Sequence, residues 1–204
     1  MKGVRAILAC LLCAVWLCCL AGCGRHKPDA RNYTRFSKWG LSFEYPEQWQ
    51  ELPADHVERA REKMLQKNQY WRLQEFAAIR VPDAEAGILV GKLTAFKVMK
   101  PSEFVEVTKR FCEDAKRAGD ITKINYVKET TIAGLPAVEH DLEHSGGVRD
   151  VTHIVMVGKA VYSVSLVVQE PEKLSDYAAE FQHIASSITI VGQPVPARKA
   201  PPQK

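Results

Sequence analysis

Three histidines and the acidic residues around them form the most chemically suggestive region of this chain. His140 and His144 lie in the string EHDLEH, and His153 follows beyond a Ser-Gly-Gly turn. If Gly146 and Gly147 alone form a two-residue turn, His140 lies opposite His153, and His144 shares their face of the two strands. Two or three converging imidazoles form a ligand set for zinc or copper.

A packing role for these histidines is the alternative interpretation. Their face also carries apolar side chains, namely Val138, Leu142, Val151 and Val155. Histidines among such neighbours are commonly packed and hydrogen bonded, and a one-residue change of register separates His140 from His153. The alternating carboxylates Glu139 and Asp141 fit the solvent-facing side of a strand.

Other catalytic signatures are absent from the sequence. It contains no histidine pair at zincin spacing, no glycine-rich phosphate loop and no Gly-x-Ser-x-Gly string. We therefore expect no enzymatic activity. The 28 basic and 24 acidic residues are close to balance, so we also expect no nucleic-acid partner.

The first 22 residues have the three-part plan of a secretory signal. Lys2 and Arg5 precede an apolar run of 15 residues, 6–20, and small residues follow it. The run is shorter than the roughly 20 residues that a spanning helix needs. We predict a cleaved signal peptide over residues 1–22 and not a permanent transmembrane helix.

Leu20-Ala21-Gly22-Cys23 resembles the lipobox of bacterial lipoproteins. The resemblance implies that Cys23 becomes the first residue and carries diacylglycerol and an N-acyl chain. Each buried methylene contributes about 0.8 kcal/mol, so several chains hold a protein stably at a membrane. The residue after Cys23 is Gly24, and not the Asp that retains some lipoproteins at the inner membrane. We expect a bacterial envelope location, on the outer membrane facing the periplasm if the cell is Gram-negative.

Cysteine usage excludes an intramolecular disulfide in the mature chain. Four of the six cysteines lie within the signal, and Cys23 is the lipidation site. The remaining thiol, Cys112, is predicted to be a half-buried small hydrophobe beside the apolar stripe of a helix. Stability must therefore come from a packed core.

Polar, proline-containing segments delimit one predicted domain. Residues 23–32 form the lipidated N-terminus and tether, 33–191 the domain, and 192–204 a Pro/Lys-rich tail predicted to be disordered. The domain contains 159 residues, enough for a single core.

Hydrophobic periodicity predicts an α+β domain. We expect a hairpin around Gly40, a helix over residues 102–118 and a second helix over 174–188. The first helix is predicted to bury the stripe Phe104, Val107, Phe111, Ala115 and Ala118. The predicted strands are 75–81, 88–99, 122–132, 135–144, 148–157 and 160–169. Short connections predict an antiparallel meander for the last four.

Several strings resemble the photosystem PsbP family and its bacterial DcrB-like relatives. They are GLSFEYPEQW at 40–49, IAGLPA at 132–137, VGKAVY at 157–162 and FQHIASSI at 181–188. The resemblance implies an α/β/α sandwich around a mainly antiparallel sheet. It also implies a non-enzymatic accessory or assembly role, in which the fold does not fix the partner.

Tyr70 and Trp71 are candidate contact residues for a protein partner, although packing against the core is the alternative. The sequence thus favours a lipid-anchored accessory protein that binds another protein at the envelope. The second hypothesis is a lipoprotein that binds a small molecule or metal, with His140 and His153 as the first residues to test.

Overall fold

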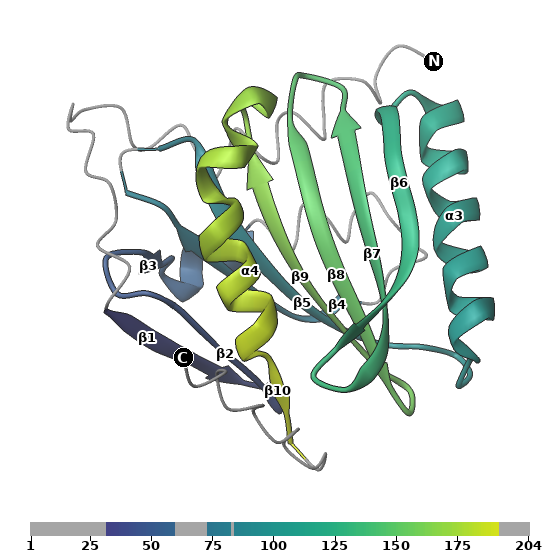
Figure 1. The fold of residues 1–204 in the computed structure, drawn as a ribbon, viewed down its shortest axis with the longest axis horizontal. Helices are drawn as coiled ribbons and strands as arrows, with labels where there is room; N and C mark the ends of the chain where they lie inside the picture. Colours follow the sequence, from purple (N-terminus) through teal and green to yellow (C-terminus); the bar gives the residue numbers. More distant parts are fainter. Residues whose placement is uncertain (1–31, 60–72, 83, 192–204) are drawn as a thin grey trace, which may run out of the picture.

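The computed structural model describes residues 32–59, 73–82 and 84–191. They form a seven-stranded sheet, a three-stranded sheet and helices on both faces of the larger sheet (Figure 1). Within the described residues, every strand pair of both sheets is antiparallel. The predicted α+β class and sandwich architecture are confirmed. The predicted signal peptide, most of the tether and the tail lie outside the described residues.

The larger sheet has the order β3-β4-β5-β9-β8-β7-β6. Its strands are β3 (Gln50–Glu51), β4 (Leu73–Arg80), β5 (Ala86–Thr94), β6 (Ile121–Ile132), β7 (Leu135–His144), β8 (Arg149–Val157) and β9 (Ala160–Val168). The predicted meander is confirmed in β6 to β9. The predicted strand 88–99 was too long, because β5 ends at Thr94, where it meets Ala160, the first residue of β9.

The smaller sheet consists of β1 (Tyr33–Lys38), β2 (Leu41–Pro46) and β10 (Thr189–Ile190). Trp39 and Gly40 form the turn of the predicted hairpin, and both have positive φ. The short β10 pairs with β2, and so ties the end of the domain to its beginning.

Three helical elements have complete described bounds: α3 (Pro101–Ala118), the 3-10 helix η1 (Pro171–Tyr177) and α4 (Ala178–Ser187). Residues 54–59 are also helical. Within the described ranges, no helix combines the length and apolarity required to span a membrane.

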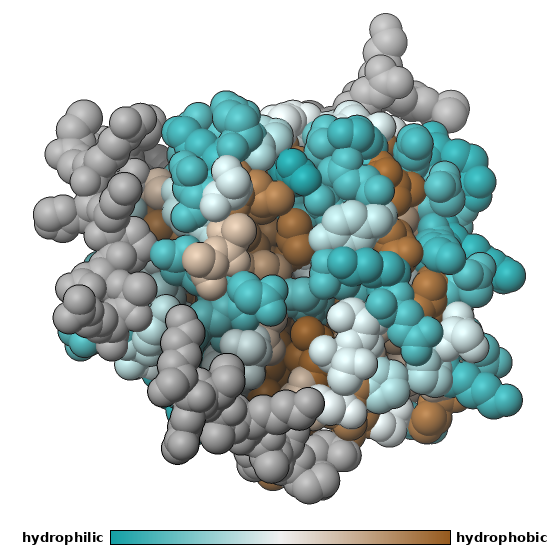
Figure 2. Space-filling model, viewed as in Figure 1, coloured by the Kyte–Doolittle hydropathy of each residue, from teal (hydrophilic) through white to brown (hydrophobic). Residues whose placement is uncertain are grey.

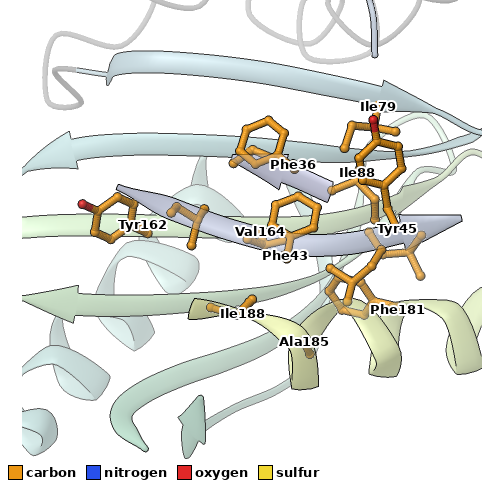
Figure 3. Close-up of a cluster of buried hydrophobic side chains, with 14 of the residues drawn as sticks. Phe36, Phe43, Tyr45, Ile79, Ile88, Tyr162, Val164, Phe181, Ala185 and Ile188 are labelled. Carbon is orange, nitrogen blue, oxygen red and sulfur yellow. The ribbon is translucent and has the colours of Figure 1, made fainter. Parts of the chain in front are cut away.

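The main core lies between the larger sheet, the smaller sheet and α4 (Figure 3). Phe36 and Phe43 stack with their ring centroids 4.8 Å apart. Phe181 and Ala185 of α4 approach the sheet from the same side, where Val164 of β9 meets them. We call this side of the sheet the α4 face.

The opposite side, the α3 face, is covered in part by α3. The helix buries Phe104, Val105, Thr108 and Cys112. Phe104 and Val105 pack with Val138 of β7 and Val161 of β9. The predicted buried stripe is confirmed for Phe104 and for Ala115, which packs with Cys112, and was wrong for Val107, Phe111 and Ala118. Val107 and Phe111 face outward and are 46% and 40% exposed, because the helix turns its Phe104-Thr108-Cys112 side to the sheet.

Candidate functional site

The turn between β7 and β8 determines which histidines meet. Ser145, Gly146 and Gly147 form a three-residue loop, and the His144 N–H donates to the Val148 carbonyl at 2.7 Å. Gly146 and Gly147 have φ of 98° and 81°, a region that favours glycine.

The extra loop residue shifts the register by one position from that predicted. His140 lies opposite Thr152, and Glu139 lies opposite His153. Neighbouring positions along a strand point to opposite faces, so His140 and His153 lie on different sides of the sheet. The predicted convergence of these two histidines was wrong.

His140 and His144 do meet, at a buried carboxylate that the sequence analysis did not single out. Asp150 Oδ2 lies 3.2 Å from His140 Nε2, and Asp150 Oδ1 is hydrogen bonded to His144 Nε2. The Thr152 hydroxyl donates to Asp150 Oδ2 at 2.6 Å and lies 2.8 Å from the Ser165 hydroxyl. We call these five residues the Asp150 cluster. It lies on the α3 face.

The charge state of Asp150 follows from its partners. Burial acts to raise the pKa of Asp150, but its hydrogen bonds and electrostatic interactions with His140 and His144 outweigh this effect and hold the pKa below its usual range. An ionised carboxylate can only accept hydrogen bonds, so both imidazoles donate from Nε2. Among the described residues, no partner bonds their buried Nδ1 atoms.

His153 has a different environment on the α4 face. Its ring stacks on Phe181 with centroids 4.9 Å apart, and its Nδ1 lies 3.6 Å from Glu139 Oε2. Burial lowers the pKa of His153, although the nearby Glu139 acts to raise it. His153 is thus a packed side chain of the main core.

The predicted solvent-facing carboxylates on β7 are also bonded within the protein. Asp141 is buried, and Arg149 donates to both of its oxygens at 2.8 and 2.6 Å. Glu139 accepts from the Tyr126 hydroxyl at 2.7 Å and pairs with Lys128 at 2.9 Å. These contacts hold the pKa values of Asp141 and Glu139 below their ordinary range against the opposing effect of burial.

Among the described residues, the hydroxyl and thiol groups near these histidines are not paired with an imidazole base. The Thr152 hydroxyl donates to the Asp150 carboxylate and not to an imidazole. Cys112 is fully buried, and burial raises the pKa of its thiol to about 11. The described part of the chain contains no group of three or more side chains arranged to hold a metal ion. Cys23, Tyr70 and Trp71 lie outside the described residues.

The sequence offered one signal for the Asp150 cluster. Asp150 and Thr152 alternate with Val151 and His153 in β8, which indicates two polar positions on one face. Which residues share that face with His140 depends on the loop, because one added residue exchanges the two faces.

Comparison with known proteins identifies the fold. No family model matches the chain, and no curated protein matches it. Among solved structures, cyanobacterial PsbP (CyanoP) from Synechocystis sp. PCC 6803 is 15% identical, with a TM-score of 0.57 over 84% of this chain and 98% of that chain. The described domain therefore has a PsbP-like fold.

Two further solved structures are similar. A protein of unknown function from Pseudomonas aeruginosa, PA94, is 18% identical over 80% of this chain and 99% of its own, with a TM-score of 0.49. LpqN of Mycobacterium tuberculosis, described as involved in cell envelope biogenesis, is 14% identical over 78% of this chain and 90% of its own, with a TM-score of 0.45.

Proposed function

We propose that this chain is a lipid-anchored, non-enzymatic accessory protein of the bacterial envelope that binds a protein partner through the outer side of α3. The anchor is supported by the signal pattern of residues 1–22 and by the lipobox-like string that ends at Cys23. An accessory role fits the PsbP-like fold and the side chains of the Asp150 cluster, which bond to one another.

The observation that carries the proposal is the outward orientation of Val107 and Phe111. They lie four residues apart, and therefore about one turn apart on the same side of α3. Exposed charged residues surround them, including the pairs Lys109–Glu106 and Arg117–Asp114. An apolar centre with a charged rim is the usual anatomy of a protein interface.

The test is capture of the intact acylated protein from detergent-solubilised envelopes after mild crosslinking. Mass spectrometry identifies what is retained. We expect one protein to be enriched reproducibly, and expect the combined Val107→Ser and Phe111→Ser variant to lose it while keeping its circular dichroism and thermal unfolding midpoint. Glu172→Ser with Lys173→Ser is the control, because it replaces two exposed side chains of η1, away from α3.

A Cys23→Ala variant tests the contribution of the anchor. We expect it to leave the membrane fraction and to retain less partner, because the lipid concentrates both proteins at one surface. Equal retention by the wild-type protein and the α3 variant would contradict binding through α3. A soluble wild-type protein would contradict the anchor.

A further inference from the structure

One end of the domain combines exposed apolar side chains with exposed lysines. Of the five exposed large hydrophobic residues in the described part of the chain, three lie there: Phe96 at 88%, Val98 at 60% and Val191 at 83% exposure. We call this the basal end. It includes the β5–α3 loop and the β8–β9 turn, and it lies along the lower edge of Figure 1.

Backbone contacts bring these segments together. The Ala95 N–H donates to the carbonyl of Lys159 in the β8–β9 turn at 2.8 Å. The Val191 N–H donates to Gly40 at 2.8 Å, and the Tyr162 hydroxyl donates to the neighbouring Trp39 carbonyl at 3.2 Å. Four segments that are far apart in sequence therefore share this end of the domain.

The β5–α3 loop is held so that its apolar side chains point outward. Ala95 and Met99 pack into the cluster beneath α3. Phe96, Lys97 and Val98 between them are all exposed. Hydrophobic surface reaches the lower right edge of the space-filling view, where α3 begins (Figure 2). A loop fixed at both ends presents these groups without first having to become ordered.

The charge at this end is mainly positive. Lys97, Lys100 and Lys159 are exposed. Glu103 is an acidic group beside them, with Oε1 3.9 Å from Lys97 Nζ and Oε2 accepting from the Lys100 N–H at 3.0 Å. The chain continues from Val191 into residues 192–204, which contain three basic residues and no acidic one. Apolar side chains interleaved with lysines suit an anionic bilayer surface.

We propose that the basal end docks on the surface of an anionic phospholipid bilayer, with Phe96 and Val98 in the interface and Lys97, Lys100 and Lys159 against the headgroups. This docking is a role beyond the proposed binding of a protein partner. Of the proposed function, it depends only on the lipid anchor. Ten residue steps separate Cys23 from Tyr33, so the connection can extend about 30 Å. Strand β1, of six residues, spans about 20 Å. The lipid can therefore reach the plane of the basal end.

Docking would set the domain upright on the membrane. Helix α3 starts at the basal end and has 18 residues, so its far end lies about 27 Å away. Val107 and Phe111 lie along the helix above the bilayer and stay accessible to a protein partner. The exposed Ala118 at the far end provides a reference position away from the lipid.

The experiment places an environment-sensitive fluorophore on the acylated protein in lipid vesicles. Phe96→Cys and Ala118→Cys variants are labelled and compared, while buried Cys112 stays in place. Vesicles contain phosphatidylcholine alone or with phosphatidylglycerol. We expect a blue shift and loss of quenching by aqueous iodide at position 96 in phosphatidylglycerol vesicles, and no change at position 118.

Charge variants test the lysines. Lys97→Glu with Lys159→Glu should abolish the shift at position 96, whereas Lys109→Glu with Lys116→Glu, which changes the net charge equally, should leave it intact. Raised salt should also reduce the shift, because the screening length falls from about 10 Å at 0.1 M to about 3 Å at 1 M.

Vesicle flotation distinguishes a failure of the docking proposal from a failure of the lipid anchor. Protein that floats with the vesicles but gives equal probe responses at positions 96 and 118 would overturn docking and leave the anchor and the protein partner intact. Protein that fails to float would overturn the anchor of the proposed function and this docking with it.

Discussion

Asp150 and His140 are bonded diagonally across two strands, with 3.2 Å between Oδ2 and Nε2, although His140 lies directly opposite Thr152. The other carboxylate oxygen is bonded to His144, four residues further along β7. One buried carboxylate thus joins two positions of β7 to β8. Because these bonds require this register, we expect the cluster to favour it over a register shifted by one residue.

Removing the carboxylate should destabilise the domain. Asp150→Ala leaves two buried imidazoles and the Thr152 hydroxyl without their shared acceptor, and we expect a loss of about 3 kcal/mol in the free energy of unfolding. Urea denaturation measures it. Asp114→Ala is the control, because Asp114 lies on the surface of α3 and its pair with Arg117 is exposed. Similar effects of the two substitutions would contradict the role of Asp150.

Stability should fall on acidification in two stages. Burial lowers the pKa of His153 below its ordinary 6.5, so the unfolded chain binds a proton there before the folded protein does. The free energy of unfolding should therefore decrease as the pH falls below about 6.5. His153→Gln should flatten this stage in urea titrations across pH. An unchanged slope would show that His153 does not titrate differently on folding.

The second stage comes from the carboxylates. The pKa values of Asp150 and Asp141 are held below their usual range, so their stabilisation is complete above the unfolded value of about 3.9 and is lost as the pH falls through the folded values. Asp141→Asn and Asp150→Asn should each reduce the slope of stability against pH below about pH 4. A slope equal to that of the wild-type protein would contradict the assignment.

Element order was predictable from sequence because short connections leave few topologies. The short turns after Ile132 and Val157 force β6 to pair with β7 and β8 to pair with β9 in antiparallel orientation, independently of side-chain packing. The pairing of β5 with β9 was not predictable, since no local signal links strands so far apart in sequence.

The failures concern rotation and register. On α3, Val107 and Phe111 are more hydrophobic than Thr108 and Cys112, so a stripe chosen by hydropathy correctly included Phe104 but took in two residues of the outer side of the helix. In the β7–β8 turn, both two-residue and three-residue loops are compatible with Ser-Gly-Gly, and the choice decides which side chains His140 meets. Each error is a shift of one residue along the chain. Local sequence does not distinguish the two positions, and packing against distant parts of the chain selects one of them.

Gly87 marks a close approach between β4 and β5. A Cβ atom at this position would lie 2.8 Å from the Ile79 carbonyl oxygen, a backbone atom that cannot move without disturbing the strand pair. Gly87→Ala should therefore cost about 1–3 kcal/mol, measured by urea denaturation. Ser163→Ala, a small change on neighbouring β9, is the control. A neutral Gly87→Ala would show that the two strands can separate locally to accommodate the methyl group.

The thiol of Cys112 should report on unfolding of the α3 face. It is fully buried between α3 and the sheet, and burial raises its pKa to about 11, so the native protein presents little thiolate at neutral pH. A maleimide should label native protein far more slowly than protein in urea, and Ala118→Cys provides an exposed thiol on the same helix. Asp150→Ala should accelerate labelling of Cys112 by a factor that grows exponentially with the free energy of unfolding that it removes, because reaction requires the helix to open. If native Cys112 reacts as fast as a cysteine at position 118, α3 does not seal this face of the sheet, and the outward placement of Val107 and Phe111 would have to be revised.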